Sequence, residues 1–213
     1  MRVLILGKSG QLAQALVSAA PVSADWVVWG RNELDLANPD QIAPQLRAFK
    51  PDGIINASAY TAVDKADQDA EAAYRLNRDA VEQIGLTAAE LNCPLVHVST
   101  DFVFDGRQSR PYQPDDPCHP LGVYGASKRA GEELLLRACP RAAIVRTAWV
   151  YRAGGGNFMS TMLRLMAERD ELGVVADQTG APTSADNLAQ VLWRVLDKGL
   201  SGIWHYTDAG AAS

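Results

Sequence analysis

Residues 1–13 read MRVLILGKSGQLA, and this stretch decides the fold. A short apolar run over residues 3–6 is followed by two closely spaced glycines, Gly7 and Gly10, and then by residues that begin a helix. Glycines permit a tight turn between strand and helix, and they let a phosphate approach the helix N-terminus. The spacing Gly-x-x-Gly-x-x-Ala therefore predicts a dinucleotide-binding turn, although glycine pairs also occur in ordinary turns of this kind.

Beyond this turn, short apolar runs alternate with longer helical stretches. Expected strands cover residues 3–6, 26–29, 53–56, 95–99, 143–146, 172–175 and 202–206. Expected helices cover residues 11–20, 40–49, 69–91, 123–137, 157–168 and 185–196. Strands that alternate with helices form βαβ units, and continuous apolar strands are typical of a sheet covered on both faces. The predicted fold is α/β: a Rossmann-like, doubly wound parallel sheet with helices on both faces.

Composition narrows the function classes. The chain has 213 residues, 47% of them hydrophobic and 21% charged, which is the balance of a globular protein. A net charge of −5 without a basic cluster argues against a nucleic-acid partner. No apolar run is long enough to span a membrane. Three dispersed cysteines predict neither a disulfide framework nor a zinc site, so we expect a cytoplasmic protein.

The end of the second expected strand bears on the choice of cofactor. An acidic residue there would bind a ribose 2′-hydroxyl and favour NAD, whereas an arginine would bind a 2′-phosphate. Trp29 is followed by Gly30 and Arg31, which favours NADPH and leaves NADH open. A solvated loop charge is the alternative interpretation of Arg31.

Three further residues suggest proton transfer to a carbonyl. Tyr124 and Lys128 are four residues apart at the expected start of a helix and so share one face. An ammonium beside a phenol lowers the pKa of the phenol from about 10, and such a tyrosine can protonate a developing alkoxide. Thr100 follows a buried strand, where its hydroxyl could bind a substrate carbonyl. A surface tyrosine beside a lysine, and a threonine that caps a strand end, are the structural alternatives.

The glycine turn, the strand-end hydroxyl and the Tyr-x-x-x-Lys pair, in this order, resemble the extended short-chain dehydrogenase/reductase family. Longer blocks are similar to the dTDP-4-dehydrorhamnose reductase family: GKSGQL at 7–12, NASAYTAVDKAD at 56–67, STDFVFDG at 99–106, PLGVYGASK at 120–128, RTAWVY at 146–151 and DQTGAPT at 177–183. These blocks cover almost the whole chain. The resemblance implies reduction of the C4 ketone of dTDP-6-deoxy-L-lyxo-4-hexulose to dTDP-L-rhamnose, with NADPH or NADH.

The resemblance also implies roles for individual residues. Tyr124 would donate the proton, Lys128 would bind the nicotinamide ribose and tune Tyr124, and Thr100 would polarise the ketone. Besides Arg31, the resemblance implies cofactor binding by Gly7, Gly10, Gln11, Leu12, Asp35, Leu36, Ala57, Ser58 and Tyr60. Trp149, Asn157 and Gln178 would bind the substrate. A core tryptophan at 149 and a helix cap at 157 are the structural alternatives.

The resemblance further predicts the domain organisation. Residues 1–150 would form a dinucleotide-binding Rossmann domain, and residues 151–213 a partial substrate-binding region interleaved with the last sheet strands. Family members usually extend well past 213 residues, so we expect an incomplete substrate pocket. Some members bridge two subunits through a metal held by a glutamate of the first helix. Residues 13–16 read AQAL and contain no glutamate, so we expect no metal, while a homodimer stays open.

Two other functions stay open at this point. Nucleotide-sugar epimerases and dehydratases share the fold and the Tyr–Lys pair, but they tend to carry Asp-Glu after the strand-end hydroxyl. Here Thr100 is followed by Asp101 and Phe102. The second alternative is a non-catalytic regulatory subunit of this fold, similar to the β subunit of methionine adenosyltransferase. The intact Tyr–Lys pair argues against it.

Overall fold

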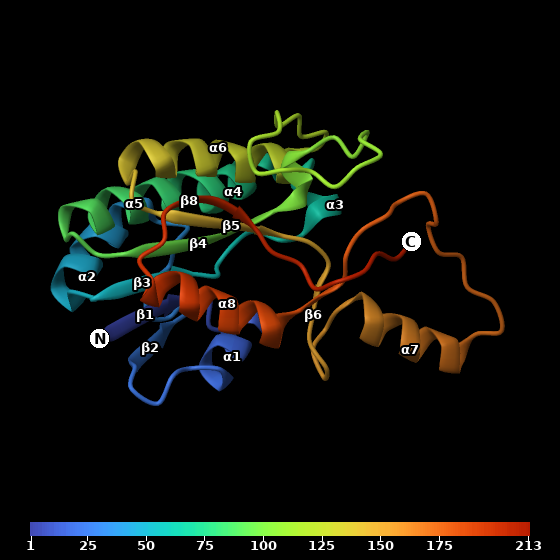
Figure 1. Cartoon of the computed structure of the whole chain (residues 1–213), viewed down its shortest axis with the longest axis horizontal. Helices are drawn as coiled ribbons and strands as arrows, with labels where there is room; N and C mark the ends of the chain where they lie inside the picture. The colour runs from blue at the N-terminus through green and yellow to red at the C-terminus, as the bar shows by residue number, and fades with distance from the viewer.

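The computed structural model describes residues 1–213 as a six-stranded parallel sheet between two layers of helices (Figure 1). The strand order is β2-β1-β3-β4-β5-β8, and every neighbouring pair is parallel. The strands are β1 (Arg2–Leu6), β2 (Asp25–Trp29), β3 (Gly53–Asn56), β4 (Leu95–Thr100), β5 (Ala143–Thr147) and β8 (Gly202–His205). The prediction of a Rossmann-like parallel sheet is confirmed.

Helices cover both faces of this sheet (Figure 1). One face carries α1 (Gln11–Ser18) and α8 (Ala185–Asp197), and the other carries α2 (Ile42–Phe49), α5 (Ala80–Glu90) and α6 (Val123–Ala138). Two short helices, α3 (Val63–Ala66) and α4 (Ala70–Tyr74), follow β3. Helix α7 (Phe158–Glu168) lies at one end, away from the sheet. No helix combines the length and apolar character that a membrane crossing requires.

The two layers are built by the alternation of side chains along each strand. Val3 and Ile5 pack against α1 and α8, whereas Leu4 and Leu6 face the layer of α2, α5 and α6. Each face forms a cluster of 17 buried hydrophobic residues, so the sheet has no face open to water. This explains why its strands are almost continuously apolar.

The expected strand over residues 172–175 is wrong, because these residues lie in a loop. Val174 and Val175 are 51% and 68% exposed, and no neighbouring strand pairs with them. Apolar residues alone do not make a strand when no partner is present to satisfy the backbone hydrogen bonds. Two short strands were missed instead: β6 (Val150–Tyr151) and β7 (Thr183–Ser184), which form a separate two-stranded parallel sheet.

The expected single helix over residues 69–91 is also interrupted. A π-turn at Arg75–Asp79 separates α4 from α5. A π-turn inserts an extra residue into the helix and turns its side chains to new directions. Here it carries the fully buried Asn77, which bonds to the segment after β3.

A buried ion pair joins α6 to β5. Arg146 Nε donates to Glu132 Oε1 at 2.8 Å, and its Nη2 donates to Oε2 at 2.7 Å. Glu132 and Arg146 are 0% and 2% exposed. The paired geometry satisfies both carboxylate oxygens where water cannot reach them. Arg129, one turn before Glu132 in α6, adds a third contact at 3.1 Å.

Glu132→Ala is expected to destabilise the fold by about 3–5 kcal/mol, because it leaves the Arg146 charge buried without its main partner. Chemical denaturation followed by circular dichroism measures this loss. The matched control is Glu168→Ala, which breaks an exposed pair with Arg164 in α7 and should change the free energy of unfolding by less than about 0.5 kcal/mol. Similar losses in the two variants would contradict the role assigned to the buried pair.

Candidate active site

The glycine turn lies between β1 and α1, at the carboxyl end of the sheet. Gly7 has a φ of +113°, and a Cβ there would lie 3.0 Å from the backbone of Ala57 and Ser58, which follow β3. Gly10 precedes the first residue of α1 in extended conformation. Only glycine fits position 7, since both its φ and the neighbouring chain exclude a side chain. The turn therefore lets another group approach the backbone closely.

A groove of about 260 Å³ opens beside this turn, between the ends of β1, β2 and β3. Seven of the predicted cofactor-binding residues line it: Gly7, Gly10, Arg31, Asp35, Leu36, Ala57 and Ser58. Three others lie outside it. Leu12 is in the core, Gln11 donates from its side chain to the Val150 carbonyl, and the Tyr60 hydroxyl faces Asp69.

Charges at the mouth of the groove leave Arg31 free. Glu33 forms an ion pair with Lys8 and accepts a hydrogen bond from the Gly30 N–H at 2.8 Å. The hydrogen bond from Lys8 lowers the pKa of Glu33. The exposed Arg31 guanidinium makes no ion pair, although Glu33 is two residues away. Arg31 is therefore available to an anion in the groove.

Thr100 and Tyr124 meet at the end of β4. Tyr124, in the first turn of α6, packs edge-on against Phe102, and its hydroxyl lies near that of Thr100. Thr100 Oγ1 also donates to Asp101 Oδ1 at 3.0 Å and accepts from the Phe102 N–H at 3.2 Å. Burial raises the pKa of Tyr124 to about 12, and the nearby Thr100 hydroxyl opposes this shift. The structure thus brings two hydroxyl groups together at one point.

Burial raises the pKa of Tyr124, and Lys128 is not among the groups that shift it, so the expected tuning of Tyr124 by Lys128 stays a prediction. Lys128 is 1% exposed, and its Nζ contacts the Val98 carbonyl at 2.7 Å and His97 Nε2 at 3.2 Å. Burial lowers the pKa of Lys128 to about 8, and Glu132 acts in the opposite direction. The shared helix face is confirmed, but the ammonium contact with the phenol is absent.

Trp149 lies between the sheet and the loop at 177–183. Its φ is +46°, a strained value for a bulky residue. A Cβ at Gly180 would be 2.6 Å from the Trp149 ring, so the ring packs directly on the loop. With 37% of its surface exposed, Trp149 is not a core residue, and that alternative is wrong. Gln178 is exposed in the same loop. Contact of either residue with a substrate stays a prediction.

Asn157 caps α7, as the structural alternative stated. Its Oδ1 accepts from the Ser160 N–H at 3.0 Å, and Ser160 Oγ accepts from the Asn157 N–H at 3.1 Å, which forms a capping box. Its Nδ2 donates to the Arg152 carbonyl at 2.8 Å and to Gln11 Oε1 at 3.3 Å. The side chain is fully engaged by the protein, and a contact with substrate stays a prediction.

Sequence reasoning missed three buried polar residues beneath the site: Asn56, His97 and Asn77. Asn77 Oδ1 accepts from the Tyr60 N–H at 2.8 Å, and its Nδ2 donates to Ser127 Oγ at 3.0 Å, which ties the segment after β3 to α6. The signal for Asn56 and His97 is a polar residue within an otherwise apolar strand, in GIIN at 53–56 and LVHV at 95–98. No local sequence pattern indicates that Asn77 is buried.

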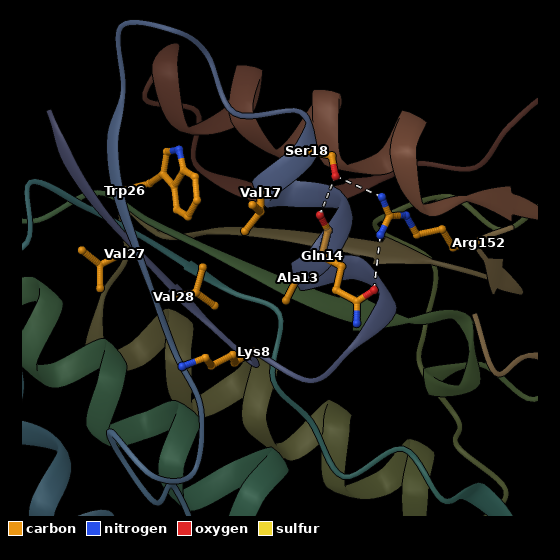
Figure 2. A pocket seen from close by; sticks show the side chains of 9 residues that line it. All are labelled: Lys8, Ala13, Gln14, Val17, Ser18, Trp26, Val27, Val28 and Arg152. Atoms are coloured by element: carbon orange, nitrogen blue, oxygen red, sulfur yellow. Dashed lines mark hydrogen bonds between the residues drawn. The ribbon is translucent and has the colours of Figure 1, made fainter. Parts of the chain in front are cut away.

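A larger hollow of about 540 Å³ lies elsewhere, between α1 and the edge strand β2. Figure 2 shows Arg152 hydrogen-bonded to Gln14 and Ser18 of α1, with Trp26 of β2 on the opposite side of the view. Neither Thr100, Tyr124 nor Lys128 lines this hollow. These three residues do not line the groove beside the glycine turn either, but that groove, although smaller, is lined by seven of the predicted cofactor-binding residues.

Gly125→Ala tests how closely α6 must approach β4. A Cβ at Gly125 would lie 2.1 Å from the Phe102 carbonyl oxygen. Helix propensity alone predicts that alanine stabilises a helix interior by about 1 kcal/mol. We expect a net loss of about 1–3 kcal/mol instead, because the helix must move. Denaturant unfolding measures the sign. Gly173→Ala, where a Cβ meets nothing within 4 Å, is the control and should be close to neutral.

Comparison with known proteins places this geometry in a family. The model of the RmlD substrate binding domain family matches residues 1–213. A dTDP-4-dehydrorhamnose reductase of Sinorhizobium fredii is 42% identical over 220 residues, which cover 100% of this chain and 74% of that protein.

Two solved structures are similar over the whole chain. A dTDP-4-dehydrorhamnose reductase from Clostridium acetobutylicum has a TM-score of 0.96 at 35% identity, over 100% of this chain and 76% of that one. The Bacillus anthracis dTDP-4-dehydrorhamnose reductase in complex with NADP has a TM-score of 0.95 at 34% identity, with the same coverage. Together with the glycine turn and the paired hydroxyls, these similarities show that the chain belongs to the dTDP-4-dehydrorhamnose reductase family.

Proposed function

We propose that this chain reduces the C4 ketone of dTDP-6-deoxy-L-lyxo-4-hexulose to dTDP-L-rhamnose, with NADPH as the reductant. The observation that carries the proposal is that the hydroxyls of Thr100 and Tyr124 lie near one another at the carboxyl end of β4. In parallel α/β sheets, ligands bind at this end of the strands. The identity of the relatives and the NADP complex of a structural neighbour support both the reaction and the cofactor.

The groove fits a dinucleotide phosphate. Gly7 and Gly10 line the groove and carry no side chain, so a pyrophosphate can approach the backbone there. The α1 N-terminus follows directly and offers free N–H groups to an anion. Arg31, unpaired at the mouth, would hold a 2′-phosphate. When bound, the cofactor supplies the hydride.

Tyr124 and Thr100 then act on the substrate oxygen. Because the pKa of Tyr124 is about 12, its hydroxyl keeps its proton at neutral pH. The Thr100 hydroxyl turns its proton from Asp101 to the C4 oxygen and so orients the ketone. As negative charge develops on that oxygen, Tyr124 Oη delivers its proton to it. The surrounding burial excludes water and strengthens both hydrogen bonds.

The remaining assignments belong to this proposal. Residues 1–150 form the dinucleotide-binding domain, and residues 151–213 contribute part of the substrate side while also supplying α8 and β8 to the main layers. Trp149, Asn157 and Gln178 face the sugar nucleotide. A cytoplasmic location and a homodimer stay predictions. The intact Thr100–Tyr124 pair favours catalysis over a purely regulatory role.

Tyr124→Phe is expected to lower kcat by at least about 100-fold, because it removes the proton donor. Oxidation of NADPH in the presence of enzymatically generated dTDP-6-deoxy-L-lyxo-4-hexulose, followed by absorbance, measures this. The Kd for NADPH should be unchanged. Tyr74→Phe, in α4, is the matched control and should retain full activity. Unchanged turnover in Tyr124→Phe would remove Tyr124 from the mechanism.

Arg31→Ala is expected to raise the Kd for NADPH about tenfold or more, because a charge-assisted hydrogen bond to the 2′-phosphate is lost. The Kd for NADH, which lacks that phosphate, should change little. Fluorescence titration with each cofactor measures both constants. An equal change for the two cofactors would show that Arg31 does not recognise the 2′-phosphate.

A further inference from the structure

Behind Lys128, a line of buried polar side chains crosses the sheet from β4 to β3. Lys128 Nζ lies 3.2 Å from His97 Nε2, and His97 Nδ1 lies 3.1 Å from Asn56 Nδ2. Asn56 Oδ1 accepts from the Ser58 N–H at 3.1 Å. Lys128, His97 and Asn56 are each no more than 1% exposed, so water does not complete their hydrogen bonding.

The backbone fixes the orientation of the Asn56 amide. The Ser58 N–H can only donate, so the atom facing it must be the amide oxygen. The amide nitrogen of Asn56 therefore faces His97. Rotating the amide by half a turn would set two donors against each other at Ser58.

The Asn56 amide in turn fixes the His97 tautomer. The amide nitrogen has no lone pair to offer, so His97 Nδ1 must be the acceptor. In a neutral imidazole, the proton then sits on Nε2, and the Nε2–H points at Lys128 Nζ. The pKa of His97 lies well below its usual value because of burial and the nearby Lys128, which agrees with a neutral ring.

Only the neutral form of Lys128 completes this chain of hydrogen bonds. An amine has one lone pair, which accepts from His97 Nε2–H, and it still donates to the Val98 carbonyl. An ammonium has donors only, so it would require His97 Nε2 to accept. The ring proton would then face the Asn56 amide donor at 3.1 Å, and one buried contact would be repulsive.

The charges around Lys128 come from few groups. In α6, Glu132 lies one turn on and favours the ammonium, but its carboxylate is already paired with Arg146 of β5 and Arg129. His97 of β4 is neutral, and Tyr124, one turn back, keeps its proton. Asp101, after β4, acts on Tyr124, and burial raises its own pKa. Burial lowers the pKa of Lys128 to about 8, in the direction that the hydrogen bonds require.

We propose that Asn56 and His97 are positioning residues that stabilise the neutral amine form of Lys128, so that in alkaline solution Lys128 takes up one proton when a nicotinamide dinucleotide binds. The proton comes from solvent and converts the amine to an ammonium. Proton uptake on binding rests on the proposed function, in which Lys128 acts as a cation at the nicotinamide ribose. The amine form of Lys128 is a property of the chain without ligand.

The tautomer is tested on the protein without added ligand. The chain has three histidines, so long-range ¹H–¹⁵N correlations of their rings can be resolved, and His97→Gln identifies the signal of His97. His119→Gln, at an exposed position, is the matched control. At about pH 9, an ordinary lysine with a pKa of about 10.4 is still charged. We expect the Nε2–H tautomer of His97 there, and the Nδ1–H tautomer would overturn the proposal.

Asn56→Asp is designed to reverse the network. An aspartate of the same shape accepts both from the Ser58 N–H and from His97 Nδ1–H, which moves the ring proton and leaves Nε2 to accept from an ammonium. We expect the His97 tautomer to switch to Nδ1–H in this variant. Because the readout is a tautomer rather than stability, a destabilised but folded variant still decides the question.

Proton uptake is tested by the pH dependence of NADPH binding. Above about pH 7.5 the 2′-phosphate is fully ionised, so its titration does not contribute. In the wild type, the Kd for NADPH should rise about tenfold per pH unit above the pKa of Lys128, from an onset near pH 8. In Asn56→Asp and His97→Gln the onset should move at least one pH unit higher, whereas His119→Gln should follow the wild type.

Proton uptake by Lys128 and the proposed function are contradicted by different results. An onset that is the same in the wild type and in Asn56→Asp overturns proton uptake through this network. Absence of NADPH binding at every pH overturns the proposed function, while the His97 tautomer still decides whether Lys128 is held as an amine.

Discussion

Helix α6 lies so close to the end of β4 that a Cβ atom at Gly125 would come within 2.1 Å of the Phe102 carbonyl oxygen. A second glycine, Gly131, lies just as close to the π-turn, where a Cβ would come within 1.9 Å of the Asn77 carbonyl oxygen. The buried pair of Glu132 and Arg146 holds the same helix to β5. The geometry of the candidate site depends on this close packing of α6 against β4. Tyr124 and Lys128 are both on α6, whereas Thr100 is on β4.

The close packing of α6 also affects the protonation states of Tyr124 and Lys128. Lys128 is buried and Tyr124 is partly buried, and burial favours the neutral form of each group. For a proton donor this is an advantage, since the phenol keeps its proton until charge develops nearby. Burial destabilises the ammonium form of Lys128, and the Glu132 carboxylate offsets this effect in part. The side chains beneath, His97 and Asn56, complete the hydrogen bonds that burial would otherwise leave open.

The two sides of the site are built differently. The dinucleotide side is formed by the ends of β1, β2 and β3 and by short turns between neighbouring elements. The opposite side comes from distant segments: Trp149 packs on Gly180, whose backbone also pairs with Ala212. Figure 1 shows α7 and the loop after it extending away from the sheet. Exposed apolar residues such as Phe158 and Leu163 on α7 show how little of this side is packed against the main layers.

Local pattern in the sequence determined the parallel sheet, the glycine turn, the six main strands and the residues at their carboxyl ends. These features follow from period, glycine placement and short connections, which act over a few residues. The same information gave a helix cap as the alternative to substrate binding for Asn157, and motif resemblance located Thr100 and Tyr124. It placed a strand at residues 172–175, where no partner strand exists, and an unbroken helix at 69–91, where the buried Asn77 requires a π-turn.

Only the tertiary structure decided which groups face one another. Lys128 turns towards His97 rather than Tyr124, and this choice depends on contacts between β3, β4 and α6 that are far apart in sequence. Its pKa and that of Tyr124 depend on burial, which is a property of the packed molecule. Trp149 likewise has a positive φ and packs its ring on Gly180, a contact between segments about 30 residues apart. A motif names the chemical groups of the site, but hydrogen-bond partners and desolvation arise from long-range packing, and these determine where the protons reside.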